Sequence, residues 1–254
     1  MRIQRVQQQP YQQKYTAKQP QTPSFGILER EVKVDFTTNI AGKILRRNNT
    51  CMYRSDLNWN ELAKFLWKKY LNTDKVNVYN YACSSGEEVY SFLIKMFESY
   101  GRENCQKFLP VIARDIDPFV IKLAKEKLIK INEDEKLLVN HNSYNKFNKY
   151  FIKNSKIENL YQPTEILTQN VKYNTGDFTQ EIETLPKDNL ILFVRNCWPY
   201  FPMSTFMELP ENLYKHLGEN CTVIVGAFDL KNSGILKYHH CGFKETHIPH
   251  VYEK

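Results

Sequence analysis

The stretch Ala-Cys-Ser-Ser-Gly-Glu-Glu at residues 82–88 lies between an apolar, strand-like run at 76–81 and a segment whose apolar residues recur with helical spacing. A strand that turns through small residues into a helix N-terminus is where α/β proteins bind nucleoside-bearing ligands. Glu87 and Glu88 would repel a phosphate group there, but they would attract a ligand with hydroxyl groups and a positive charge. An ordinary turn, in which both carboxylates complement the helix dipole, explains the same residues and stays open.

The rest of the chain alternates between apolar runs and amphipathic segments. The apolar runs predict four further strands, at residues 108–113, 171–174, 190–194 and 221–227. Helical spacing predicts helices at 57–70, from Pro118 onward and at about 204–217, where Pro210 should kink the helix or mark its first turn. This alternation indicates an α/β fold with a mostly parallel, doubly wound, Rossmann-like sheet. The tail at 242–252 predicts an antiparallel C-terminal hairpin at the sheet edge.

Composition divides the chain into three segments. Residues 1–25 are rich in Gln, Pro, Thr and Lys and poor in apolar side chains, so we expect a disordered basic tail. Residues 26–72 predict a short N-terminal helical segment, and residues 73–254 form the expected ligand-binding domain. Within that domain the stretch at about 131–170 is polar and irregular, which indicates an insertion or a small subdomain.

The basic excess is confined to the N-terminal end. Residues 1–54 hold ten Lys and Arg against three Asp and Glu, a net charge of +7, whereas the remaining 200 residues hold 25 of each. Such an arm is able to meet nucleic acid, anionic lipid or an acidic protein surface, and a solvated tail is the alternative. Because no base-reading motif accompanies the charge, we do not expect nucleic acid as the partner.

Several features concern the cellular compartment. No apolar run approaches the roughly 20 residues that cross a bilayer, and the first residues lack the apolar core of a secretory signal. The six cysteines are widely spaced without a C-x-x-C pair, which favours free, mostly buried thiols. His239 and His240, as neighbours on a strand, would point to opposite faces and so predict no metal site. We therefore expect a cytoplasmic protein without metal or membrane insertion.

Polar residues follow the predicted strands in order. In a doubly wound sheet, ligand-binding groups lie just past the carboxyl ends of the strands. Asp115 suits a ribose because one carboxylate accepts hydrogen bonds from both hydroxyls, whereas capping the next helix suits Asp117 better. S-adenosylmethionine has a ribose, an ammonium and a sulfonium, and its chemistry matches these strand ends. They are Glu87 and Glu88, Asp115, Asp177, and Arg195 with Asn196.

Together these motifs resemble the CheR-type chemotaxis-receptor methyltransferases. Their order and spacing match that family from Asn48 to the C-terminus. The resemblance implies a class I methyltransferase fold that uses S-adenosylmethionine to esterify glutamate side chains of a receptor coiled coil. The matching motifs are Asn48-x-Thr50-x-x-x-Arg54, Ser85-Gly86-Glu87-Glu88-x-Tyr90-Ser91, Asp115-Ile116-Asp117, Arg195-Asn196-x-x-x-Tyr200-Phe201 and Val251-Tyr252-x-Lys254.

The resemblance also implies roles for single residues. Arg54 and Tyr200 match the positions nearest the transferred methyl group, where Arg54 would orient the incoming carboxylate and Tyr200 would donate a hydrogen bond to it. A structural salt bridge for Arg54 and a core-edge position for Tyr200 are the alternatives. The implied cofactor contacts are Asn48, Thr50, Arg54, Gly86, Glu88, Asp115, Asp177, Phe178, Arg195 and Asn196.

The sequence departs from the family pattern at several positions. Met52 replaces one of two aromatic residues before the arginine, Val89 replaces a proline, and residues 197–199 are bulkier than the usual aliphatic trio. Fewer than fifty residues precede the first motif, where the family carries a compact helical domain, and the insertion is short and rich in Asn and Lys. The expected partner is a protein with accessible glutamates on an acidic helical surface. A different methyl acceptor and a non-catalytic binding module stay open.

Overall fold

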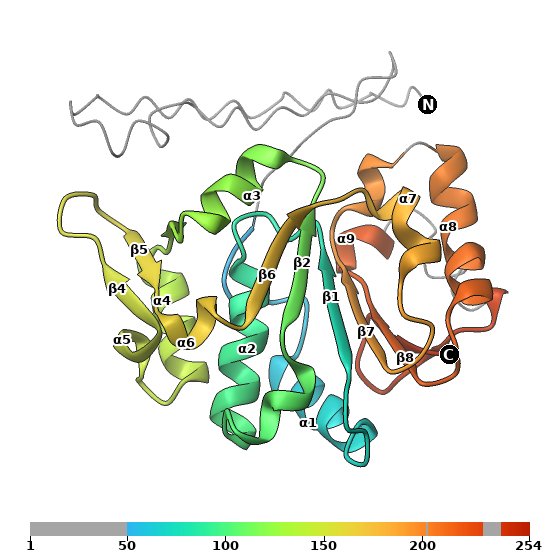
Figure 1. Ribbon diagram of the computed structural model, residues 1–254, viewed down its shortest axis with the longest axis horizontal. Helices are drawn as coiled ribbons and strands as arrows, with labels where there is room; N and C mark the ends of the chain where they lie inside the picture. Colours follow the sequence, from blue (N-terminus) through green and yellow to red (C-terminus); the bar gives the residue numbers. More distant parts are fainter. Residues whose placement is uncertain (1–49, 202, 231–239) are drawn as a thin grey trace, which may run out of the picture.

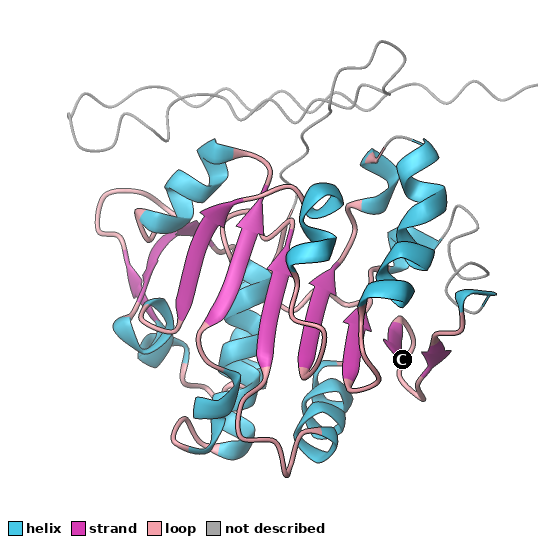
Figure 2. Cartoon of the chain, turned by 45° about the vertical axis from the view of Figure 1, so that its right-hand side comes forward, coloured by secondary structure: helices cyan, strands magenta, loops and turns pink. Residues whose placement is uncertain are grey.

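The computed structural model describes residues 50–201, 203–230 and 240–254, and in these parts a seven-stranded sheet has helices packed on both faces (Figures 1 and 2). The strand order is β6-β2-β1-β7-β8-β10-β9, and the first five strands are parallel. This confirms the expected doubly wound sheet. The five parallel strands are β1 (Asn77–Tyr81), β2 (Val111–Asp115), β6 (Val171–Thr175), β7 (Leu190–Val194) and β8 (Cys221–Ile224).

The central strand β7 shows why the sheet is covered on both faces. All of its residues are buried. Successive side chains of a strand point to opposite faces, and here Ile191 and Phe193 enter one hydrophobic core while Leu192 enters the other. Both layers therefore exclude water from this strand, which is the condition for a stable parallel sheet.

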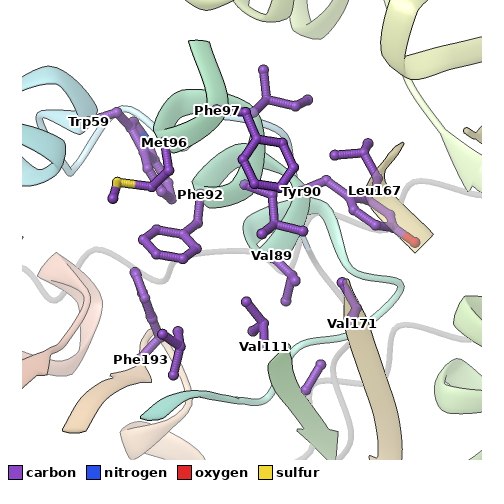
Figure 3. Packing of buried hydrophobic residues seen from close by; sticks show 14 of the residues in the cluster. Trp59, Val89, Tyr90, Phe92, Met96, Phe97, Val111, Leu167, Val171 and Phe193 are labelled. Carbon is purple, nitrogen blue, oxygen red and sulfur yellow. The ribbon is translucent and has the colours of Figure 1, made fainter. Parts of the chain in front are cut away.

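The turn at residues 82–88 connects β1 to α2 (Glu87–Tyr100) as expected. Gly86 precedes the helix with φ 104°, a conformation that favours glycine. A Cβ atom at this position would lie 2.2 Å from the hydroxyl of Tyr173. Figure 3 shows α2 side chains, among them Val89 and Phe92, facing Val111 and Phe193 of the sheet.

Other helices begin at residues that suit a helix start. Asn58 caps α1 (Trp59–Lys69), and Asp117 caps α3 (Pro118–Lys125), with a carboxylate oxygen accepting from the Phe119 amide at 2.9 Å. The helix α8 (Met203–His216) contains Pro210 in its interior, so the alternative that Pro210 marks the first turn is wrong. Outside the small three-stranded sheet, the described residues also form short helical segments: α6 (Glu165–Thr168), α7 (Phe178–Glu181), α9 (Ala227–Leu230) and the 3₁₀ turns Asn104–Phe108, Ile182–Thr184 and Trp198–Tyr200.

The insertion is regular, which corrects the expectation of an irregular segment. It holds a three-stranded antiparallel sheet in the order β3-β5-β4 together with two helices. Aromatic residues supply its core, since Phe147 packs against both Phe151 and Tyr161 at ring-centroid distances of 5.1 Å. Its elements are β3 (Ile129–Lys130), α4 (Glu133–Asn142), α5 (Phe147–Tyr150), β4 (Phe151–Lys153) and β5 (Leu160–Pro163).

The C-terminal hairpin is confirmed. The strand β10 (Val251–Glu253) pairs antiparallel with both β8 and β9 (Lys244–Glu245). All six cysteines are free, as expected. Within the described residues, no helix has the length and hydropathy to span a membrane. The predicted disordered tail, Asn48 and His239 lie outside the described residues.

Candidate functional site

The carboxyl ends of β1, β2, β6 and β7 lie along one edge of the sheet because these neighbouring strands run parallel (Figure 2). Asp115, at the end of β2, reaches the turn after β1. One of its carboxylate oxygens accepts from the amide of Ser84 at 2.9 Å, and the other accepts from the amide of Asp117 at 2.9 Å. Each carboxylate oxygen carries two lone pairs, so a bond to a backbone amide and a bond to a hydroxyl group suit the same oxygen chemically.

Glu88 and Arg195 meet across the β1–β7 pair, although 107 residues separate them in the sequence. A guanidinium nitrogen of Arg195 donates to one carboxylate oxygen of Glu88, and the Asn80 amide donates to the other at 2.8 Å. The side chain of Arg195 is 1% exposed. The structure thus brings two predicted cofactor contacts together as a buried ion pair, with Glu88 held in one orientation.

Asp56 completes this ion pair, and sequence reasoning missed it. Its Oδ1 accepts from Arg195 at 2.5 Å, and its Oδ2 accepts from the amide of Ala227 at 3.0 Å. Burial alone would raise the pKa of Asp56, but the Arg195 guanidinium and the Ala227 amide hold it below its usual value. Asp56 therefore joins the segment before α1 to the end of β7 and the start of α9. Its place two residues after Arg54 was the available signal.

Asp229 organises the loop that carries Asn196, and it was also missed. Its two carboxylate oxygens accept from the amides of Asn196 at 2.5 Å, Gly226 at 2.7 Å and Trp198 at 2.9 Å. Burial raises the pKa of Asp229 to about 7, although these amides oppose the rise. Asn196 has φ 58°, and a Cβ atom on Gly226 would lie 2.3 Å from its Oδ1. An acidic residue in the first turn of a helix after a strand was the available signal.

Glu87 turns into the protein, unlike its neighbour Glu88. It is 4% exposed, Ser85 donates to its Oε1 at 2.7 Å, and its Oε2 has no hydrogen-bond partner among the described residues. Burial raises the pKa of Glu87 to about 7, while the Ser85 hydroxyl, the Glu87 amide and, more weakly, the nearby Thr50 side chain oppose the rise. Thr50, a predicted cofactor contact, therefore lies at the start of α2.

The remaining predicted site residues divide into two sets. Arg54 and Tyr200 are half-buried, so both keep exposed surface for a ligand or substrate. Asp177 caps α7, with Oδ1 accepting from the Thr179 amide at 2.9 Å, and Phe178 is buried against Tyr81 with ring centroids 5.0 Å apart. The structure thus gives Asp177 and Phe178 structural contacts in addition to any contact with a cofactor.

Taken together, the site presents carboxylates beside a small-residue turn and one half-buried arginine. Asp115 and Glu88 suit hydroxyl and ammonium groups, and these are the groups that S-adenosylmethionine presents. No group of His, Cys, Asp and Glu able to hold a metal was found in the described residues. A five-stranded parallel core, a C-terminal antiparallel pair of strands and this turn define a class I, Rossmann-like methyltransferase fold.

Comparison with known proteins gives the family. The CheR methyltransferase family, through its SAM-binding domain, matches residues 48–240. The chain therefore belongs to the CheR methyltransferase family, and S-adenosylmethionine is its cofactor. The turn at 82–88, Asp115 and Glu88 all lie within the matched region.

The curated relatives share only about a quarter of their residues with this chain over the aligned regions. The chain is 26% identical to the chemotaxis protein methyltransferase of Borreliella burgdorferi over 70% of this chain and 63% of that protein. It is 23% identical to chemotaxis protein methyltransferase 2 of Vibrio cholerae over 59% of this chain and 50% of that protein. The chain thus spans half to somewhat under two thirds of these relatives. Magnesium protoporphyrin IX methyltransferase from Synechocystis with bound SAM has a TM-score of 0.37 at 14% identity, covering 76% of this chain and 74% of that one.

Proposed function

We propose that this protein transfers the methyl group of S-adenosylmethionine to glutamate carboxylates of a protein substrate that resembles a chemoreceptor. The match of the CheR SAM-binding domain over residues 48–240 carries this proposal. The names of the two curated relatives, both chemotaxis methyltransferases, support the class of substrate. Glutamates on an acidic helical surface of a cytoplasmic partner are the acceptors that we propose.

The residues of the site suit such a reaction. When bound, S-adenosylmethionine supplies an electrophilic methyl group on a positively charged sulfur. An ionised glutamate needs no general base, so the protein has to orient the carboxylate, hold it in line and exclude water. Half-buried Arg54 would hold the incoming carboxylate by a charge-assisted hydrogen bond, and half-buried Tyr200 would donate a second one.

The other predicted residues would bind the cofactor. Asp115 would accept from the ribose hydroxyls, and Glu88, oriented by Arg195 and Asn80, would face positive charge. Arg195 itself has two guanidinium nitrogens occupied by carboxylates, so its contribution would act through Glu88. The remaining proposed contacts are Asn48, Thr50, Arg54, Gly86, Asp177, Phe178 and Asn196.

Two measurements test the proposal. Calorimetric titration with S-adenosylhomocysteine should show binding by the wild type, and Asp115→Ala should weaken it by roughly tenfold or more because a buried acceptor of two hydroxyls is lost. Asp188→Ala, which removes a carboxylate before β7, is the matched control and should bind as the wild type does. Unchanged binding by Asp115→Ala would contradict the assignment of the site.

The acceptor requires a second experiment. Incubation with tritiated S-adenosylmethionine and a lysate of the host should label a protein, and mild base should release the label as methanol because the product is a carboxyl ester. A base-stable label would exclude glutamate as the acceptor. Binding of the cofactor without any labelled fraction would favour a binding module over an enzyme.

A further inference from the structure

We propose that Glu135, in helix α4 of the insertion, is a positioning residue for cofactor binding. It holds the segment 50–54, which bears Thr50 and Arg54, against the start of α2. The inference rests on the proposed function, because that proposal assigns Thr50 and Arg54 to the cofactor site. The insertion would thereby support the cofactor site of its own chain.

The contact between the insertion and this segment is direct. Oε1 of Glu135 accepts from the amide of Met52 at 2.9 Å, across 83 residues of sequence. Glu135 is 8% exposed and Met52 is fully buried, so this hydrogen bond is shielded from water. Without Glu135 the amide of Met52 would lose its partner in a buried place, which is unfavourable.

The other carboxylate oxygen of Glu135 is anchored within α4. Oε2 accepts from the amide of Asn132 at 2.9 Å, and the Asn132 side chain accepts from the amide of Glu135 at 2.9 Å. This reciprocal pair is a capping box, which fixes the rotamer of Glu135. A side chain that is held at one oxygen presents the other to Met52 with little loss of conformational freedom.

Helix α2 holds the next residue of the same segment. The Ser91 hydroxyl accepts from the amide of Tyr53 at 2.9 Å and donates to the carbonyl of Glu87 at 2.7 Å. Two consecutive amides, those of Met52 and Tyr53, are therefore held from two different helices. The backbone that leads to Arg54 is fixed on both sides, and Thr50 lies two residues before the first of these attachments.

Asn132, the N-cap of α4, and Glu133, its first residue, allow the positioning role to be separated from helix capping. Asn132→Ala removes the cap of α4 but leaves Oε1 of Glu135 able to accept from Met52. Glu135→Ala removes both, and Glu135→Gln keeps an oxygen for Met52 while giving up the second acceptor. Glu133→Gln is the matched charge control, because Glu133 lies in the same first turn with its side chain 71% exposed.

The experiment measures the Kd for S-adenosylhomocysteine by calorimetry and the midpoint of thermal unfolding for each variant. Glu135→Ala should raise the Kd by about tenfold or more. Asn132→Ala should lower the unfolding midpoint yet leave the Kd within about twofold of the wild type, as should Glu133→Gln. Glu135→Gln should restore most of the affinity. If Glu135→Ala does not fold, Glu135→Asp, which is one methylene shorter, should show the same rise in Kd.

Two outcomes overturn the inference, and Arg54→Ala distinguishes them. If Arg54→Ala weakens binding but Glu135→Ala and Asn132→Ala have the same Kd, only the positioning role fails. If Arg54→Ala leaves the Kd unchanged, the assignment of the segment to the cofactor site fails, and this inference fails with it.

Discussion

Two pairs of carboxylates at the same edge of the sheet differ in burial and in what stabilises their charge: Asp56 and Glu88 are half-buried, whereas Glu87 and Asp229 are buried. Asp56 and Glu88 share the guanidinium of Arg195, and we call these three residues the ion cluster. Glu87 and Asp229 accept hydrogen bonds from hydroxyl or backbone groups instead, and we call them the neutral-donor carboxylates. Burial raises the pKa of both neutral-donor carboxylates to about 7, whereas that of Asp56 lies below its usual value.

Burial alone does not decide ionisation at this site, since the pKa of Asp56 is lowered although its partial burial acts to raise it. Glu87 and Glu88 are consecutive residues of one helix, but only Glu88 reaches the arginine at the end of β7. A buried charge with a cation in contact stays ionised, while one with neutral donors takes up a proton more readily. Near neutral pH Asp56 is therefore expected to stay ionised, whereas Glu87 and Asp229 are expected to titrate.

The largest expected effect comes from removing the cation of the ion cluster. Arg195→Met leaves two carboxylates without their counter-charge and should lower the free energy of unfolding by about 5 kcal/mol, measured by urea denaturation. Arg114→Met is the control, because Arg114 and Glu181 form a pair whose side chains are 28% and 22% exposed. That variant should lose about 1 kcal/mol or less. Equal losses would contradict the special position of Arg195.

Removing a neutral-donor carboxylate should cost somewhat less. Asp229→Ala deprives three amides, including that of Asn196, of their acceptor and should destabilise the protein by about 4 kcal/mol in the same assay. Asp177→Ala removes a half-buried helix cap and should cost about 1 kcal/mol. If the two variants were equally stable, the loop after β7 would not depend on Asp229.

The titration of Glu87 gives a pH dependence with a defined sign. Its pKa is raised in the folded state to about 7 from an ordinary value of 4.5, so the folded protein holds a proton that the unfolded chain has released. Its contribution to stability is full below about pH 4.5 and is lost as the pH rises toward 7, by roughly 3 kcal/mol.

Glu87→Gln should remove this loss. The variant and the wild type should unfold at similar urea concentrations at pH 5, and the variant should be more stable at pH 8. Glu61→Gln, in the first turn of α1 where the side chain is 40% exposed, should follow the wild type at both pH values. Parallel pH profiles for Glu87→Gln and the wild type would show that Glu87 does not titrate in this range.

The smallest expected effect comes from the second carboxylate of the ion cluster. Asp56→Asn leaves Arg195 with Glu88 as its remaining anion and should cost about 2 kcal/mol, measured at pH 7. Because the pKa of Asp56 is lowered by folding, its contribution is present above the ordinary pKa and is lost as the pH falls through the folded value. The variant should therefore approach the wild type in acid. A constant difference across pH would contradict this.

Much of the fold was predictable because its signals are local. The apolar run at 190–194 coincides with β7, and the small-residue turn at 82–88 does connect β1 to α2. The regular elements of the insertion were not predicted because its strands, such as Phe151–Lys153, are short and polar in part. Their apolar residues become a core only when Phe147, Phe151 and Tyr161 come together. Composition does not reveal such packing.

The candidate site was predictable in its residue types and less so in their partners. The acidic strand-end residues were found because parallel strands place their carboxyl ends together. Asp56 and Asp229 were missed because each acts through groups far away in the sequence. Asp56 pairs with Arg195, which lies 139 residues later in the sequence. Asp229 accepts a hydrogen bond from the amide of Asn196, which lies 33 residues earlier.

The alternation of strands and helices, the polar strand ends and the family motifs can be read from the chain alone, because periodicity, turn residues and spacing are properties of neighbouring residues. The pairing of the charges cannot, because it depends on the folded arrangement. Whether Glu87 or Glu88 meets Arg195, and whether Glu135 reaches Met52, depends on how α2, α4 and the sheet pack against one another. Electrostatic and hydrogen-bond energies act over a few ångströms, and those distances exist only in the folded chain.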